Sequence, residues 1–286
     1  MTTSISSAAM LVDLRISVWT ARKKAKDEEA QLIQDSNARS AKAASVHKHL
    51  LADAEPLMAV GRWASDCRRW LYLHTLPWSD NGARLLPTAQ FFTFKTEVTQ
   101  RETHFWQLVT VFEREYPVLI TSMALQLGSL FNRNEYPDPR TIVDKFGWQL
   151  TFSPVPEAGD FRVDVPADAM NELKNDYARE ADRRVESAMR DAWDRLHTTI
   201  AHMKEKLEPS GDGKTKRLHE TMLINAGELC AVLTSLNIMN DPKLEEARRK
   251  LEQIVETTDT QSLRESDELR ESVKKKLDEI NDKFAL

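Results

Sequence analysis

The sequence predicts a mainly α fold: an elongated bundle of long helices, arranged as coiled-coil-like hairpins, with one small β-hairpin near residues 148–165. Three observations predict it. Neither proline nor glycine occurs between Pro166 and Pro209. Apolar side chains recur along that segment at helical spacing. Two short runs before Pro166 alternate apolar and polar residues, which is typical of strands.

The segment after Pro166 carries the clearest helical pattern. Its apolar residues advance 37 positions in ten steps, or 3.7 residues per step. A stripe with this period stays on one side of a nearly straight helix. We therefore expect one helical rod about 60 Å long, at about 1.5 Å per residue. The stripe consists of Met170, Leu173, Tyr177, Ala181, Val185, Ala188, Ala192, Leu196, Ile200, Met203 and Leu207.

Residues 1–130 are expected to form an N-terminal helical region. The chain has neither proline nor glycine from Ser7 to Glu55. Apolar residues spaced three or four apart from Leu11 to Ala25 predict a helix there, with a more polar middle that projects from the body. A second helix is predicted over Leu57–Leu76, where a cluster of turn residues follows.

A further long helix is predicted after Thr88, which is a suitable N-cap, and Pro117 is expected to open the helix after it. The stretch 116–132 contains 17 residues and no charged side chain. A helix that spans a bilayer needs about twenty predominantly apolar residues. We therefore expect a helix buried inside the bundle, with insertion into a membrane as the alternative.

Residues 131–165 are expected to form a proline-rich loop with a β-hairpin insertion. The runs Trp148–Phe152 and Phe161–Val165 each alternate apolar and polar side chains, and prolines and a glycine lie between them. This pattern predicts two antiparallel strands joined by a longer loop. A two-stranded ribbon is marginal alone, so it must pack on the helices or on a partner.

Residues 166–286 are expected to form a C-terminal region of long helices. A helix is predicted over Thr221–Leu236. Asp241 and Pro242 predict the N-cap and first position of the next helix. A capping box that begins at Ser262 is expected to restart the helix toward the C-terminus. One continuous elongated domain is expected to contain all three regions.

The charge distribution disfavours a nucleic-acid partner. The 286 residues carry a net charge of −5. Residues 1–165 hold 19 basic and 19 acidic side chains, and residues 166–286 hold 21 and 26. Neither part has the concentrated positive charge that binding a phosphate backbone requires.

Cysteine usage favours a reducing compartment, and a cytoplasmic location is expected. Cys67 and Cys230 lie far apart in helical contexts, which does not suggest a disulfide framework. The apolar run Ala8 to Val12 has no basic residue before it, and Asp13 follows at once. No signal peptide is therefore expected.

The motifs of common enzymes and metal sites are missing from the sequence. Gly213-Lys214-Thr215 resembles the end of a phosphate-binding loop, but Glu208 stands where that motif needs a glycine. No histidine has a glutamate three residues before it, as di-metal helical bundles require. No Gly-x-Ser-x-Gly turn occurs. We expect no catalytic, cofactor-binding or metal-binding residues, and no enzymatic activity.

Several stretches together resemble an uncharacterised family of phage, plasmid and bacterial proteins, domain-of-unknown-function family 3150. The stretches are Arg84-Leu85-Leu86-Pro87, Phe112 to Tyr116-Pro117, Tyr136-Pro137, Phe146-Gly147, the run Pro154 to Val163, and Ala192 to Leu196 with His202-Met203. The resemblance covers residues 10–255. It implies no catalytic residues. It does imply a partnership with MoxR- or CobS-like AAA ATPases, near which such proteins are often encoded.

These observations favour a non-enzymatic helical scaffold or adaptor that forms homo-oligomers or docks a protein partner such as an AAA ATPase. The expected contact residues lie on the hairpin, where a ribbon exposes both edges. They are Trp148, Phe152, Phe161 and Arg162. The alternative for these aromatic residues is that they attach the hairpin to the bundle.

Two other functions remain open at the level of sequence. A helical pore-forming or membrane-remodelling protein would use the uncharged stretch 116–132 and the hairpin. A phage protein that handles nucleic acid would show binding that falls steeply with salt. The acidic balance of the chain disfavours this last reading.

Overall fold

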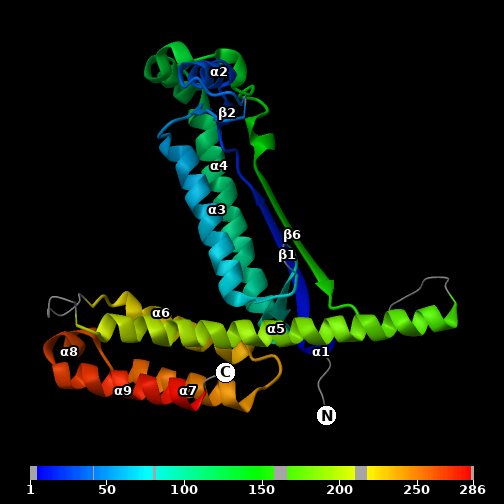
Figure 1. Ribbon diagram of the computed structural model, residues 1–286, viewed down its shortest axis with the longest axis vertical. Helices are drawn as coiled ribbons and strands as arrows, with labels where there is room; N and C mark the ends of the chain where they lie inside the picture. Colours follow the sequence, from blue (N-terminus) through cyan, green and yellow to red (C-terminus); the bar gives the residue numbers. More distant parts are fainter. Residues whose placement is uncertain (1–4, 41, 80–81, 158–165, 210–217, 285–286) are drawn as a thin grey trace. The chain divides into compact units, whose positions relative to one another are not determined.

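The computed structural model describes the chain except for residues 1–4, 41, 80–81, 158–165, 210–217 and 285–286 (Figure 1). Helices account for 69% of the described residues, and a small antiparallel sheet accompanies them. The prediction of a mainly α fold is confirmed. The chain divides into two compact units, each assembled from segments far apart in the sequence. Unit 1 is Met1–Asp13, Trp70–Phe94 and Thr151–Leu286, and unit 2 is Leu14–Arg69 and Lys95–Leu150.

The predicted helical rod is α5, which runs from Ala167 to Leu207 in unit 1. Its 41 residues correspond to about 60 Å. The stripe deduced from the sequence is buried along the C-terminal half. Its buried members are Ala188, Ala192, Leu196, Ile200, Met203 and Leu207. The prediction of an unbroken helix after Pro166 is confirmed.

Three further helices pack around the buried half of α5 in unit 1: α6 (Thr221–Leu236), α7 (Pro242–Glu256) and α9 (Asp267–Lys283) (Figure 1). Contacts join α5 to α6, α6 to α7, α7 to α9 and α9 back to α5, so the four helices form a closed ring. Each contributes leucine to a common core. The short α8 (Thr260–Glu265) precedes α9. Asp259 and Ser266 cap these two helices, so Ser262 does not serve as the predicted N-cap.

A four-stranded sheet has the order β4, β5, β1, β6. The strands are β4 (Leu76–Pro77), β5 (Arg84–Pro87), β1 (Ala9–Ser17) and β6 (Gly147–Pro154). β5 pairs antiparallel with both β1 and β4, and Leu85 lies opposite Leu11 on one side and Leu76 on the other. These three leucines are at most 7% exposed and join the core of unit 1.

The helix predicted between Ser7 and Glu55 is wrong, and the region 1–130 is not helical throughout. This segment contains β1, β2 (Arg22–Lys24), α2 (Lys26–Asp35) and β3 (His47–His49). Along β1, Val12, Leu14 and Ile16 alternate with polar residues. That is the period of a strand, and the β-branched residues favour it. β2 and β3 pair antiparallel to form a small ribbon.

Two long helices supply most of the core of unit 2: α3 (Glu55–His74) and α4 (Phe91–Leu127). α3 confirms the helix predicted over Leu57–Leu76, but it begins and ends two residues earlier. α4 continues through Pro117, so the prediction that this proline opens a new helix is wrong. Proline removes one backbone hydrogen bond from a helix interior. Phe112, Tyr116 and Ile120, all at most 5% exposed, anchor the turns on both sides and keep the helix continuous.

The uncharged stretch 116–132 is only partly buried, contrary to expectation. Tyr116, Ile120 and Met123 face the core of unit 2. Val118 and Leu125 are 72% and 88% exposed. Within the described residues, no helix is sufficiently long and apolar to cross a bilayer.

The first strand of the predicted hairpin is β6. In the described residues it is the edge strand next to β1, and not half of an isolated ribbon. The second strand, expected over 161–165, lies outside the described residues. The remaining elements are short. They are α1 (Ile5–Ala8) and the 3-10 turns Thr88–Gln90, Gly128–Leu130, Arg133–Glu135 and Ile142–Lys145.

Candidate functional site

Two of the contact residues predicted from the sequence, Trp148 and Phe152, pack against helices. Trp148, half-buried in unit 2, lies with its ring 5.5 Å from that of Phe105. Phe152, half-buried in unit 1, has its ring centroid 5.3 Å from that of Phe91. These contacts are those expected if the aromatics attach the strand to the helices. Phe161 and Arg162 lie outside the described residues.

One polar atom of Trp148 lacks a partner. Its indole Nε1 is buried and donates no hydrogen bond within the described part of the chain. Buried hydrogen-bond donors normally have an acceptor. The indole of Trp63, for example, donates to the Arg101 carbonyl over 3.0 Å. The indole of Trp148 is an exception.

The two cysteines are buried and unpaired with each other. Burial raises the pKa of the Cys67 thiol, although the nearby Arg101 guanidinium opposes this effect. Burial also raises the pKa of Cys230 to about 11. A thiol acts as a nucleophile in its ionised form, so neither cysteine is activated near neutral pH. The described residues contain no group of three or more His, Cys, Asp or Glu side chains placed to hold a metal ion.

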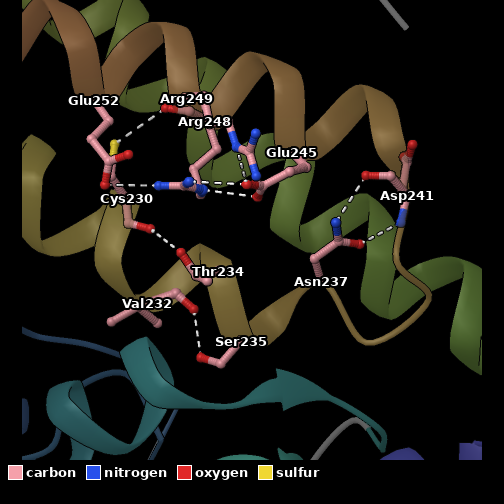
Figure 2. A network of polar contacts seen from close by, with 10 residues as sticks. All are labelled: Cys230, Val232, Thr234, Ser235, Asn237, Asp241, Glu245, Arg248, Arg249 and Glu252. Atoms are coloured by element: carbon pink, nitrogen blue, oxygen red, sulfur yellow. Dashed lines mark hydrogen bonds and ion pairs between the residues drawn. The ribbon is translucent and has the colours of Figure 1, made fainter.

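A network of charged and polar residues connects α6 to α7 (Figure 2). Arg248, whose side chain is 7% exposed, lies between Glu245 and Glu252 at 2.9 and 2.8 Å. Its hydrogen bond to Glu245 lowers the pKa of that carboxyl to about 2. The Cys230 thiol donates to the Arg248 carbonyl over 3.8 Å. The guanidiniums of Arg248 and Arg249 each have a carboxylate partner in this network. The network therefore stabilises the contact between α6 and α7, and it offers no unpaired charge to a ligand.

A different arrangement occurs in a pocket of unit 1, which we call the arginine pocket. Its volume is about 580 Å³. Residues from β4, β5, the segment between these strands and the N-terminal half of α5 line it. They are Pro77, Trp78, Ser79, Arg84, Glu180, Arg183, Arg184 and Ser187. Three arginines and one glutamate leave an excess of two positive charges among the lining residues that the structure describes.

Arg84 is the most buried cation of this pocket, at 9% exposed. Its Nε donates to the Thr75 hydroxyl over 2.7 Å, and its Nη2 donates to the Thr75 carbonyl over 3.1 Å. Its guanidinium lies 4.3 Å from the centre of the Tyr72 ring. Among the described residues no carboxylate pairs with it. Burial, and next the charge of Arg195, lower the pKa of Arg84.

Arg195, on α5, also donates hydrogen bonds to the backbone near Thr75. Its Nη1 donates to the Leu73 carbonyl and its Nη2 to the Thr75 carbonyl, both over 2.9 Å. Asp191, one turn earlier on α5, pairs with Arg195 at 2.7 Å. The acid nearest to the buried pair of arginines is therefore already engaged by Arg195.

The two arginines on α5 share one acid. Glu180 accepts from Arg183 at 2.8 Å and from Arg184 at 2.9 Å. The hydrogen bond from Arg184, and then the charge of Arg183, lower the pKa of Glu180, so it is ionised at neutral pH. The Arg184 guanidinium also lies 5.5 Å from the centre of the Trp78 ring. The spacing of Glu180, Arg183, Arg184 and Ser187 places all four on one side of the helix.

Comparison with known proteins adds no relative: no family model, curated protein or solved structure matches the chain. Membership of domain-of-unknown-function family 3150 therefore remains a prediction from the motifs. The class of protein that the fold defines is a mainly α protein with a small antiparallel sheet. Its most developed candidate site is the arginine pocket.

Proposed function

We propose that this protein is a non-enzymatic helical scaffold: an elongated bundle of long helices that associates with itself and docks a protein partner. One observation carries the proposal. α4 presents three apolar side chains to solvent, Val111, Val118 and Leu125, which are 38%, 72% and 88% exposed. We call these residues the α4 row. An exposed apolar surface of this kind is typical of protein interaction sites.

The spacing of the α4 row favours another helix as its occupant. Its members are seven residues apart, so they follow one side of the helix as a heptad position does. A second copy of the same helix, lying antiparallel about a two-fold axis at Val118, would place Val111 opposite Leu125. A parallel pair would instead bring the exposed Arg114 of each copy together, and like charges repel. The antiparallel pair is therefore favoured.

The resemblance to the phage, plasmid and bacterial family adds a second expected partner, a MoxR- or CobS-like AAA ATPase. A scaffold with two kinds of contact would hold such an ATPase in an assembly. The buried, free cysteines support a reducing compartment such as the cytoplasm for this assembly.

Size-exclusion chromatography with light scattering tests the proposal. We expect the wild-type chain to form a dimer, and the double variant Val118→Glu, Leu125→Glu to remain monomeric. Ile224→Glu is the matched control, because Ile224 is apolar and 54% exposed on α6, in the other unit. The control variant should dimerise like the wild type. The scaffold proposal would be contradicted if the chain stays monomeric at every concentration and does not bind a MoxR- or CobS-like AAA ATPase encoded near it.

A pore-forming protein is the second candidate, and one observation favours it. Val118 and Leu125 lie in the uncharged stretch 116–132, so an apolar and uncharged surface is available to a lipid interface. Release of dye from liposomes separates the two candidates. Release that is lost in the Val118→Glu, Leu125→Glu variant would support the pore-forming function over the scaffold.

A further inference from the structure

The arginine pocket contains more positive charge than its own residues neutralise. Three guanidiniums line it, and Glu180 is the only acidic residue among the lining residues that the structure describes. Burying a cation without a carboxylate is costly, because the charge loses its hydration. A protein normally offsets this cost with a nearby anion. Among the described residues, the most buried of the three arginines has no carboxylate paired with it, because the nearby Asp191 is paired with Arg195.

Arg84 is the residue that most needs an anion. Among the described residues, its hydrogen bonds and its ring contact are to neutral groups: the Thr75 hydroxyl, the Thr75 carbonyl and the ring of Tyr72. Its Nη1 forms no hydrogen bond within the described residues, and the side chain lines the pocket. A guanidinium has five N–H donors in a planar fork, which matches the oxygens of an oxyanion.

Arg183 and Arg184 can complete an anion site from the opposite side of the pocket. Both depend on the single carboxylate of Glu180, so one negative charge serves two positive ones. The Arg183 side chain is 73% exposed and is therefore able to turn toward a ligand without disturbing the core. Ser79 and Ser187 add two hydroxyl groups to the lining.

We propose that the arginine pocket binds a small molecule that carries a phosphate monoester. A phosphate monoester has a charge of about −1.5 to −2 at neutral pH, which matches the excess of two positive charges. A carboxylate would neutralise only half of that excess. The volume of about 580 Å³ falls in the range of small-molecule sites and exceeds the space needed by the phosphate group alone. The rest of the ligand would occupy the remaining space.

This site is independent of the α4 row, because it lies in unit 1 and its residues have no part in the proposed self-association. Calorimetric titration of the full chain at low salt tests it. The probes are ribose 5-phosphate, inorganic phosphate and ribose. We expect ribose 5-phosphate to bind more tightly than inorganic phosphate, and ribose not to bind. Raising the salt concentration should weaken binding, because the attraction is electrostatic.

Arg183→Gln should weaken binding of ribose 5-phosphate by about tenfold, the usual effect of losing one charge-assisted hydrogen bond. Because this side chain is exposed, the variant should fold. Arg179→Gln is the matched control: it removes the same charge one turn earlier on α5, from a side chain that is 74% exposed and outside the pocket. The control should leave affinity unchanged.

Three results would overturn the proposal. The first is that neither ribose 5-phosphate nor inorganic phosphate binds at concentrations up to about 10 mM, because a dissociation constant above that value would be too weak for a specific site. Inorganic phosphate binds as tightly as ribose 5-phosphate, which would indicate an adventitious ion only. Arg179→Gln weakens binding as much as Arg183→Gln does, which would indicate a general effect of helix charge.

Discussion

Arg84 and Arg195 donate to the same carbonyl oxygen, that of Thr75, over 3.1 and 2.9 Å. Arg84 belongs to β5 and Arg195 to α5, so one backbone carbonyl connects the sheet to the long helix within unit 1. Thr75 is 0% exposed, and water cannot replace either donor. The position of Arg84 in the arginine pocket therefore depends on Arg195, which does not itself line the pocket.

Arg195→Met should destabilise unit 1 by about 2 kcal/mol. The variant removes charge-assisted hydrogen bonds to the Leu73 and Thr75 carbonyls and leaves Asp191 without its cation. Denaturant unfolding measures the change. Arg190→Met is the control, because Arg190 is 66% exposed and lies 3.6 Å from Glu186. An exposed pair of this kind contributes little. Equal losses in both variants would contradict the role of Thr75.

Asp241→Ala should cost about 2 kcal/mol, because one carboxylate performs two tasks. Its Oδ1 accepts from the Lys243 backbone at 2.9 Å and caps α7, while its Oδ2 accepts from the Trp193 indole at 3.1 Å. Thermal unfolding followed by circular dichroism measures the loss. Asp241→Asn keeps the capping oxygen, so its loss of stability should be less than half of the loss in Asp241→Ala. A loss in Asp241→Asn as large as in Asp241→Ala would show that the cap contributes nothing.

The helices of the C-terminal region were predictable because local signals agree with the tertiary contacts. α5 is bounded by prolines and carries an unbroken apolar stripe, and Asp241 caps α7 as its sequence indicates. Where local and non-local information compete, the prediction failed. Residues Leu11 to Val18 fit both a helical spacing and a strand alternation. Pairing with β5, more than sixty residues away in sequence, decides in favour of the strand.

The arginine pocket shows the same limit for a site. Two signals were present in the sequence. Arg84 stands directly before the apolar residues Leu85 and Leu86, and Glu180, Arg183 and Arg184 share one side of α5. Neither signal predicts that Arg84 and the charged residues of α5 line the same pocket, because about a hundred residues separate them and no motif spans that distance. The hairpin aromatics were the more visible features, yet Trp148 and Phe152 pack against helices.

Stability should fall on the acid side through Glu245. Arg248 lowers the pKa of this carboxyl from 4.5 to about 2 in the folded chain. Because the pKa of Glu245 is lower in the folded chain than in the unfolded chain, its ionised form stabilises the fold at pH values above the unfolded pKa of 4.5. This stabilisation is lost as the pH falls toward 2. Glu245→Gln should therefore be less stable than the wild type by about 2 kcal/mol at neutral pH. The difference should shrink at acid pH.

Thermal unfolding of both proteins at a series of pH values measures this difference. Glu271→Gln, an exposed position on α9, is the control, and at neutral pH it should be less destabilising than Glu245→Gln. A difference for Glu245→Gln that does not change with pH would show that the pairs with Arg248 and Arg249 make no ionic contribution.

Pro117→Ala should stabilise α4. Pro117 lies inside the helix, is exposed, and cannot donate to the carbonyl one turn earlier. Alanine restores that donor and favours the helix, so we expect a gain of about 1 to 3 kcal/mol in the free energy of unfolding. Pro242→Ala is the matched control. Pro242 opens α7 at a position where no intrahelical donor is needed, so its replacement should give no gain.

Denaturant unfolding of the two proline variants separates the alternatives. A gain confined to Pro117→Ala would show that the core contacts of Phe112, Tyr116 and Ile120 hold α4 together against the proline. A loss in Pro117→Ala would show instead that the helix geometry at this proline is itself required for packing. In that case the α4 row would depend on the proline, because Val118 follows it directly, and self-association should weaken in the same variant.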